Sequence, residues 1–508
     1  APASFANGNN VTISGATQSE YNGTFAIGNI NAGARTFTYT VPVHPTSPDT
    51  SLSITATGAG GITKAQLVNW VRGENIQTED NPTATTTLVR GHLHGDVLHS
   101  RPAVINYNRT GQPADRDLFV YYGSNDGIVH AVKGGQNDAD GNEKWGFIPT
   151  EFYQGFARLY LQGPITSTSA PRTYFADGPV SVNAVYVNDR MEGVGAHAQI
   201  YVGMRRGGRF YYSLDVTDPD HPVYKWKIDN TMTGFAELGQ SWSEAKVVKV
   251  RLNTCPGTAD ADGNCTVLVF GAGYDAAAND PDTQGTATMG RGIFVVDAVT
   301  GTLIWHTSPV ASGSVTMPVG ATYRQASGMD FAIPADLAVI NSDLDNQNLA
   351  DRIYAADTGG NIWRVNISDP VPGNWGVAKV ASLGGSGANA RKFLFSPDTV
   401  AFDSTTDSIL IGSGDREHPF DTTIANRYYM IKDSHGMTDL PGTVATESDL
   451  CNLTANNIQG TDTVAAQADK DCLATCKGWF IQLGTGEKTV TGATTLGGTT
   501  IFATNTPA

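Results

Sequence analysis

The stretch Ile353-Tyr-Ala-Ala-Asp-Thr-Gly-Gly-Asn-Ile-Trp-Arg-Val365 is a clear example of the strand-turn-strand pattern that recurs along this chain. Two short runs of apolar and β-branched residues enclose a turn that contains Asp357, Gly359 and Gly360. Runs of this kind on both sides of a glycine turn are typical of a β-hairpin, because glycine adopts the positive φ angles that tight turns require. The stretch therefore predicts two neighbouring antiparallel strands.

The same theme recurs from about Leu98 to the end of the chain: a strand, a Gly/Asp turn, a second strand, and then a Trp or Phe. Six or seven such pairs, at an irregular spacing of about 60 residues, are typical of a β-propeller, in which each four-stranded sheet packs against its neighbours. We therefore predict an all-β fold, a modified β-propeller with long loop insertions. The pairs are Phe119–Val132; Ile200–Gly203 with Phe210–Val216; Val267–Gly271 with Gly292–Asp297; Ile353–Val365; Ile409–Gly412 with Tyr428–Ile431; and Trp479–Leu483 with Thr500–Ala503.

The chain divides into three predicted regions. Residues 1–58 alternate apolar and polar side chains between Gly/Asn turns, which predicts a small β-sandwich-like module. Residues 59–97 hold a helix and a linker, and residues 98–508 form the propeller with its calcium loop. The helix is expected over 62–71, ending at Arg72-Gly73, with one apolar face made of Ile62, Ala65, Leu67, Val68 and Val71.

Composition limits the function classes. The 508 residues include 57 Gly, carry 16% charged side chains and have a net charge of -16. This acidity argues against nucleic acid and anionic membrane surfaces as partners and favours cation binding. No apolar run reaches the roughly 18 residues that a membrane span requires. The opening Ala1-Pro-Ala-Ser has no signal peptide, so we expect an excised or processed piece of a longer chain.

A candidate calcium loop lies directly before the hairpin Ile353–Val365. Asp343, Asp345 and Gln347 occupy loop positions 1, 3 and 5, Leu349 offers a backbone carbonyl at position 7, and Asp351 stands at position 9. Ca²⁺ takes six to eight oxygen ligands, and this alternation directs oxygens at one ion. Gln347 and the missing bidentate Glu predict a weak site, with a Kd between about 10⁻⁶ and 10⁻³ M. The alternative is a polar hairpin whose acids are merely solvated.

Two further acidic turns rank behind this loop. Asp138-Ala-Asp140-Gly-Asn142, followed by Glu143, and Asp260-Ala-Asp262-Gly-Asn264 also place oxygens at positions 1, 3 and 5. Their ninth positions, Gly146 and Leu268, offer no side-chain oxygen. We therefore interpret both as polar turns.

Five cysteines predict two disulfides and one free thiol. Cys255 and Cys265 bracket the second acidic turn, while Cys451, Cys472 and Cys476 cluster near the C-terminus with their pairing open. A zinc site would need a second His or Cys pair at finger spacing, which Cys472 and Cys476 do not have. Disulfides, acidity and a calcium loop together place the chain outside the cytosol.

Several long motifs, taken in order, resemble the C-terminal domain of the PilY/PilC proteins, which are type IV pilus biogenesis factors and tip-associated adhesins. The motifs are Gly95-Asp-Val-Leu-His-Ser-Arg-Pro102, Gly123-Ser-Asn-Asp-Gly-Ile-Val-His-Ala131, Gly207-Gly-Arg-Phe-Tyr-Tyr-Ser-Leu-Asp-Val-Thr-Asp-Pro219, Asp357-Thr-Gly-Gly-Asn-Ile-Trp-Arg-Val365 and Gly478-Trp-Phe-Ile-Gln-Leu483. The resemblance runs from about Ile62 to the end, with residues 1–58 as an extra insertion.

The resemblance implies a seven-bladed propeller with one calcium site on Asp343, Asp345, Gln347, Leu349 and Asp351. It implies that calcium occupancy regulates pilus extension and retraction, twitching motility and surface attachment. The expected partners are minor or major pilins and host or abiotic surfaces. The expected location, after export through the periplasm, is the cell surface, at the pilus tip or the outer membrane.

An enzyme is the rival class, and we predict that the chain is not one. The repeats are similar to quinoprotein dehydrogenase propellers, but the chain lacks their adjacent cysteine pair and regular tryptophan repeat. A hydrolase would draw on residues close in sequence, but no Gly-x-Ser-x-Gly motif occurs. A third alternative is a ligand-binding propeller unrelated to pili. The hydrolase candidates are His92, His94, His99, His130 and Ser100.

Overall fold

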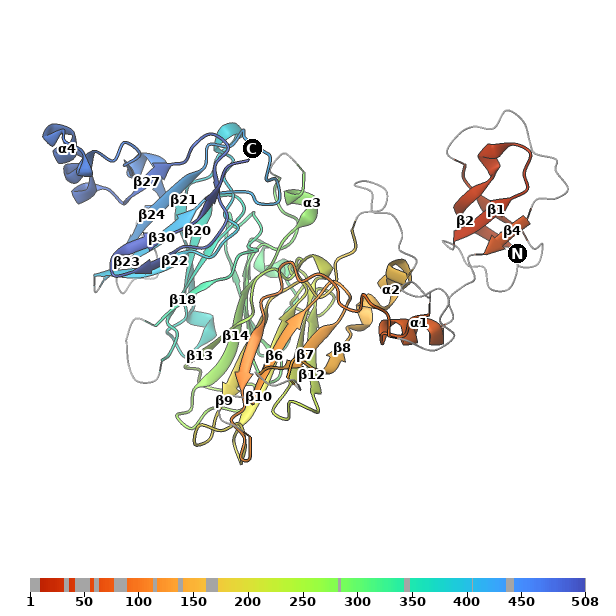
Figure 1. Cartoon of the computed structure of the whole chain (residues 1–508). Helices are drawn as coiled ribbons and strands as arrows, with labels where there is room; N and C mark the ends of the chain where they lie inside the picture. Colours follow the sequence, from red (N-terminus) through yellow and green to blue (C-terminus); the bar gives the residue numbers. More distant parts are fainter. Residues whose placement is uncertain are drawn as a thin grey trace. The chain divides into compact units, whose positions relative to one another are not determined.

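A computed structural model shows two compact units (Figure 1): unit 1 is made of residues 1–93 and 153–164, and unit 2 of residues 94–152 and 165–508. No helix among the described residues is both long and apolar enough to cross a membrane. The residues that the structure describes are 10–31, 36–41, 55–58, 64–76, 89–112, 117–135, 140–160, 172–281, 285–341, 348–403, 405–434 and 443–507.

Unit 1 contains one antiparallel sheet in the order β3-β2-β1-β4. Its strands are β1 (Asn10–Ser14), β2 (Gly23–Asn31), β3 (Thr36–Tyr39) and β4 (Thr55–Gly58). Alternation in β1 buries Val11 and Ile13, which pack with Ile27. In the described residues the module is therefore a single sheet with a small core.

The helix α1 (Lys64–Val71) lies where the sequence predicts one, and Gly73 follows it with a φ of 102°. The predicted apolar face is wrong, because Trp70 is its buried residue whereas Val68 is 45% exposed. Trp70 meets Tyr160 of α2 (Tyr153–Tyr160) at 5.6 Å between ring centroids, and the Arg90 guanidinium lies 3.9 Å over its ring. Among the described residues, α2 and Arg90 therefore cover the side of α1 that carries Trp70, and Val68 lies on an exposed side.

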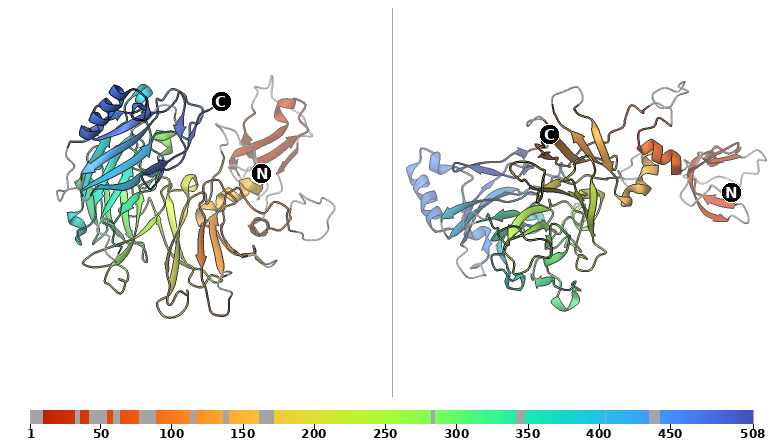
Figure 2. Two further views of the ribbon diagram at one scale, coloured as in Figure 1. Left: turned by 60° about the vertical axis from the view of Figure 1, so that its left-hand side comes forward. Right: turned by 90° about the horizontal axis from the view of Figure 1, so that it is seen from below.

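The described residues of unit 2 form five sheets with four antiparallel strands each, as in propeller blades, and two short two-stranded ribbons. The third, fourth and fifth sheets each carry an additional parallel strand. Figure 2 shows from two sides that the sheets follow one another in chain order. The predicted all-β propeller class is confirmed, while the count of seven blades stays a prediction.

The strands of the first sheet are β5 (Ala103–Asn106), β6 (Leu118–Gly123), β7 (Val129–Lys133) and β8 (Glu143–Phe147), and those of the second are β9 (Val180–Val185), β10 (His197–Gly203), β11 (Phe210–Asp215) and β12 (Val223–Asp229). The third sheet contains β13 (Lys246–Val250), β14 (Cys265–Gly271), β15 (Ile293–Asp297), β16 (Leu303–Ser308) and β17 (Thr322–Gln325). The fourth contains β18 (Ala338–Ile340), β19 (Arg352–Ala356), β20 (Asn361–Asn366), β21 (Gly376–Ser382) and β25 (Ala445–Thr446). The fifth contains β22 (Asp398–Asp403), β23 (Thr406–Gly412), β24 (Arg427–Ser434), β27 (Gly478–Gln482) and β26 (Cys451–Asn452).

The first five predicted strand pairs form the two middle strands of these sheets, from β6–β7 to β23–β24. The sixth pair is wrong. Trp479 lies in β27, which closes the fifth sheet, and Ile501 lies in a separate ribbon of β29 (Thr494–Leu496) and β30 (Thr499–Ile501). Both segments have β-forming sequences, and sequence alone does not show which strand each one pairs with. A second ribbon joins β28 (Lys488–Thr489) to β31 (Thr504–Asn505).

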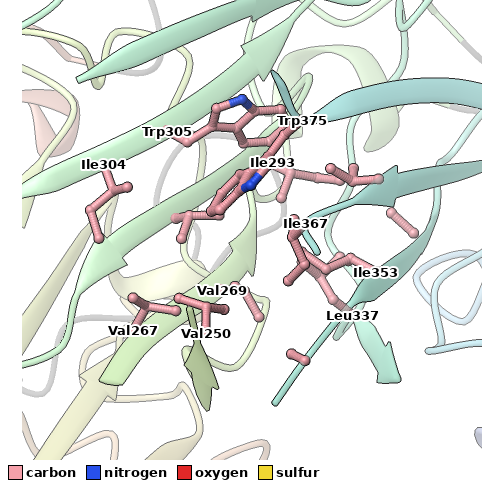
Figure 3. Close-up of a cluster of buried hydrophobic side chains, with 14 of the residues drawn as sticks. Val250, Val267, Val269, Ile293, Ile304, Trp305, Leu337, Ile353, Ile367 and Trp375 are labelled. Carbon is pink, nitrogen blue, oxygen red and sulfur yellow. The ribbon is translucent and has the colours of Figure 1, made fainter. Parts of the chain in front are cut away.

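Apolar cores between consecutive sheets hold unit 2 together. Every residue of β15, β16 and β19 is buried, so these strands pack on both faces. Figure 3 shows Ile293 and Trp305 of the third sheet together with Ile353 of the fourth and Trp375, which precedes β21. The two tryptophan ring centroids are 5.7 Å apart, so these rings pack against each other between the two sheets.

The predicted two disulfides and one free thiol are confirmed. Cys255–Cys265 closes the β13–β14 loop, and Cys451–Cys472 joins β26 to α4 (Thr463–Thr475). Cys476, directly after α4, is the free cysteine.

Candidate metal site

The candidate calcium loop connects β18 to β19, which pair antiparallel with Ile340 opposite Arg352. The strand that follows the loop thus lies where the sequence predicts it. Leu349 and Asp351 are described by the structure and stand two residues apart at the C-terminal arm of the loop. The other three predicted ligands, Asp343, Asp345 and Gln347, lie outside the described residues.

The neck of the loop has features that fit a cation. Asn348 has a φ of 53°, a left-handed conformation that asparagine adopts more readily than most other residues. Asn341 donates from Nδ2 to Asn348 Oδ1 at 3.4 Å, while its own Oδ1 is buried with no hydrogen-bond partner among the described residues. A buried amide oxygen without a donor is costly, and a cation would satisfy it.

Asp351 is held by its backbone at the base of the loop. Its N–H donates to Ile340 O at 2.9 Å, and its carbonyl accepts from Ile367 N at 2.8 Å. The side chain is buried, and Oδ1 lies 3.6 Å from Arg352 Nη1. A buried carboxylate needs compensating positive charge. The position therefore suits a calcium ligand, and Arg352 supplies positive charge beside it.

Arg352 continues into a buried polar network between the fourth and fifth sheets. Its Nε donates to Asp407 Oδ2 at 3.1 Å, and the Tyr354 hydroxyl lies 2.9 Å from Asp407 Oδ2 and 2.7 Å from Asp433 Oδ2. Arg364 Nη1 donates to Asp433 at 2.8 Å. Burial, with the charges of Asp433 and Asp407, raises the pKa of Tyr354 far above its ordinary value, so its hydroxyl remains a donor. The network joins the end of the loop to β23 and β24.

Sequence reasoning missed this network, although a signal was present. Arg352, Arg364, Asp407 and Asp433 stand in strands that also contain apolar runs, and charged residues are seldom buried unless they are paired. Which acid pairs with which arginine depends on how two sheets pack.

The acidic turn at 260–264 binds its own backbone. Asp260 Oδ1 accepts the N–H groups of Asp262 and Asn264 at 3.0 and 2.9 Å, and Oδ2 accepts from Lys249 Nζ at 2.8 Å. Burial opposes ionisation of Asp260, but these hydrogen bonds hold its pKa below the ordinary value. The carboxylate is thus satisfied in the manner of a polar turn.

The turn at 138–143 is described only from Asp140 onward, so Asp138 lies outside the described residues. Glu143 Oε1 lies 2.6 Å from His130 Nδ1. The carboxylate of this turn is therefore engaged by a histidine on the neighbouring strand β7.

A histidine cluster on the first sheet bears on the enzyme alternative. Ser124 Oγ lies 2.9 Å from His130 Nε2, and Glu143 lies at Nδ1, the order found in serine hydrolases. Burial lowers the pKa of His130, but hydrogen bonds to Asp126 and Glu143 raise it to about 9. The imidazole therefore holds its proton at neutral pH, and Ser124 is only 1% exposed. This geometry does not support a serine nucleophile.

The sequence candidates for a hydrolase have structural partners. Ser100 Oγ accepts the Gly123 N–H at 2.8 Å, His99 Nδ1 lies 2.8 Å from Asp177, and His94 Nε2 lies 2.8 Å from the Tyr122 hydroxyl. His92 belongs to unit 1. Sequence reasoning missed Ser124, because its contact with His130 depends on the β6–β7 register.

Comparison with known proteins identifies relatives of this chain. It is 25% identical over 351 residues to a type IV pilus biogenesis factor PilY1 homologue of Xylella fastidiosa, covering 64% of this chain and 20% of the relative. It is 27% identical over 322 residues to PilY1 of Pseudomonas aeruginosa, covering 60% of this chain and 23% of the relative. The chain thus spans about a fifth of the length of these relatives.

The crystal structure of the Pseudomonas aeruginosa PilY1 C-terminal domain shares the fold, with a TM-score of 0.51 and 19% identity, covering 77% of this chain and 76% of that one. No family model matches the chain. The chain is therefore homologous to PilY1 proteins over about 60% of its length, as the sequence motifs predict.

Proposed function

We propose that this chain is a type IV pilus biogenesis and adhesion factor in which calcium occupancy of the loop 343–351 regulates pilus extension and retraction. Twitching motility and surface attachment would follow from that regulation. The names of its relatives support the pilus assignment. The proposed partners are minor or major pilins and host or abiotic surfaces, and the proposed location is the cell surface, with the pilus.

One observation carries the calcium part of the proposal: Asp351, at the end of the loop, is buried and lies next to Arg352, which reaches the fifth sheet through Asp407. A bound calcium ion would neutralise the mutual repulsion of Asp343, Asp345 and Asp351. Arg352 lies between two carboxylates and is shared by them. When Asp351 has another cation, Arg352 can pair more fully with Asp407, which changes the contact between two sheets.

Calorimetric titration with calcium tests the site. The wild-type chain should bind one ion with a Kd between about 10⁻⁶ and 10⁻³ M, and magnesium should not compete at equal concentration. Asp351→Ala should abolish this binding. Asp260→Ala is the matched control, because it removes an acid of the second acidic turn whose carboxylate is already hydrogen-bonded. Unchanged binding in Asp351→Ala would reject the site.

Pilus assays test the regulatory role in cells that express the full-length protein. Asp351→Ala should change surface pilus number and twitching, whereas Asp351→Lys places a tethered cation at the site and should imitate occupancy. If pilus number and twitching stay the same in both variants, the chain is a ligand-binding propeller without this role.

A further inference from the structure

A cavity of about 1100 Å³ lies within unit 2 beside the neck of the candidate calcium loop. Its wall includes residues of β9, β13 and β18, each of which is the edge strand of its sheet. Residues 258–261 of the disulfide-closed loop add a further wall. The cavity thus brings together segments that lie more than 150 residues apart in the sequence.

The cavity exposes strand edges rather than one strand face. All four residues from Lys246 to Lys249 line it, as do the consecutive residues 183–185 and 339–341. Alternate side chains of a strand point to opposite faces, so an unbroken run of lining residues is expected where a strand presents its edge. An extended peptide can pair with such an edge through its backbone.

The lining is cationic within an acidic protein. Lys225, Lys246 and Lys249 face two carboxylates, Asp215 and Asp260, whereas the whole chain carries a net charge of -16. Lys249 Nζ lies 2.8 Å from Asp260, and Lys225 Nζ lies 4.0 Å from Asp215.

Lys246 differs from the other two lysines. It donates to the Leu337 carbonyl at 3.4 Å, and within the described residues it has no carboxylate in ion-pair distance. A carboxylate that enters the cavity can therefore pair with Lys246 without breaking an existing ion pair. This makes Lys246 the primary anion contact.

The rest of the lining favours a peptide over other anions. Val248, Val339 and Ile340 provide apolar contacts between the charged groups, and no Phe, Tyr or Trp side chain is among the described lining residues. Single-stranded nucleic acids bind through bases stacked on aromatic rings, and sugar rings commonly use the same kind of surface. A peptide that alternates acidic and apolar residues matches both the charge and the strand edge.

The loop and the cavity are physically connected. Asn341, Asn348 and Ala350 line the cavity, and Ala350 N donates to the Lys249 carbonyl at 2.8 Å. A divalent cation held next to this wall would increase the positive potential inside the cavity. Its occupancy would also fix the arm of the loop that touches β13.

We propose that this cavity binds an extended acidic peptide segment of a partner protein, and that calcium in the loop 343–351 strengthens the binding. The calcium dependence rests on the function proposed above, whereas the peptide site rests on the cavity alone. The partner is thus defined by its chemistry: carboxylates alternating with small apolar side chains.

Fluorescence anisotropy with the full chain tests the site. The probe is a labelled eight-residue peptide of alternating Glu and Val, and a Lys-Val peptide of equal length is its control. The acidic peptide should bind at least tenfold more tightly than the basic one, and added salt should weaken it because the contact is electrostatic. Equal binding of the two peptides would overturn the proposal.

Charge reversal locates the contact. Lys246→Glu should lower the affinity for the acidic peptide at least tenfold. Lys470 is an exposed lysine on α4, and Lys470→Glu should leave that affinity unchanged. Lys246→Ala, with an expected loss of about threefold or more, covers the case in which the reversed charge disturbs β13. An unchanged affinity in the folded Lys246 variants would overturn the site. Polygalacturonate, an anionic polysaccharide, serves as a competing ligand. If it binds at Lys246 and the acidic peptide does not, the peptide proposal is overturned.

Repeating the peptide titration with calcium and with magnesium separates the peptide proposal from the calcium proposal. Calcium should raise the affinity for the acidic peptide at least threefold relative to magnesium. Asp351→Ala should remove that increase and leave the affinity measured without calcium unchanged. Calcium binding in calorimetry without any gain for the peptide overturns the coupling and leaves the metal site standing. Peptide binding through Lys246 without calcium binding overturns the metal site and leaves the peptide site standing.

Discussion

Two acidic loops of this protein share a spacing and differ in what their carboxylates do. In the β13–β14 loop, Asp260 accepts two N–H groups of its own turn and the ammonium of Lys249, and a disulfide closes the loop. In the β18–β19 loop, Asp351 is buried beside Arg352 and leads into ion pairs with the next sheet. Asp260 at position 1 of its turn is saturated by local donors, whereas Asp351 at position 9 of the other loop faces an arginine. The donors around each carboxylate, rather than the spacing alone, therefore decide whether it is available to a metal.

The largest expected effect concerns the buried ion pair between Arg352 and Asp407, next to the β18–β19 loop. Arg352→Ala should lower the free energy of unfolding by about 3–5 kcal/mol, because it leaves Asp407 buried without its cation. Lys249→Ala removes the half-exposed partner of Asp260 and should cost no more than about 1 kcal/mol. Urea unfolding of both variants measures the difference. Similar costs would mean that the two loops do not differ in burial as described.

The disulfide distinguishes the first loop from the second. Cys255→Ser combined with Cys265→Ser opens a short ring, with a sequence separation of 10, and should destabilise unit 2 by about 2–3 kcal/mol. Calcium affinity at 343–351 should not change, since that loop is held by the β18–β19 pairing. Thermal unfolding of the double variant measures the loss of stability, and calorimetric titration measures its calcium affinity. A loss of calcium binding would show that the two loops act as one site.

The smallest expected effect is a pH response of the first loop. The pKa of Asp260 is lowered in the folded chain, so its stabilising contribution is present above the ordinary Asp pKa and is lost as the pH falls through the lowered value. The amide resonances of Asp262 and Asn264 should therefore shift during acid titration by NMR. Asp260→Asn is the control and should show no such transition. A transition that persists in this variant would assign it to another group.

Local features of the fold could be predicted from the sequence. Five of six strand pairs depend on residues near one another in the chain, and the number of disulfides follows from the cysteine count, whereas the pairing of Cys451 with Cys472 does not. The sixth pair failed because Trp479 and Ile501 are strand-forming segments that pair with different partners. The helix face failed because Trp70 is covered by Tyr160 and Arg90, far from it in sequence.

An all-β chain of repeated hairpins and a cysteine count that leaves one free thiol could be derived from the amino-acid sequence, and the oxygen-rich loop predicts a calcium site. The packing of distant strands was needed to show that Asp351 adjoins a buried network with Asp407 and Asp433, that His130 lies between Ser124 and Glu143, and that three lysines line one cavity. Hairpins follow from turn and strand propensities, which act between near neighbours. Buried charge pairs and cavities arise only when sheets distant in sequence pack together and exclude water.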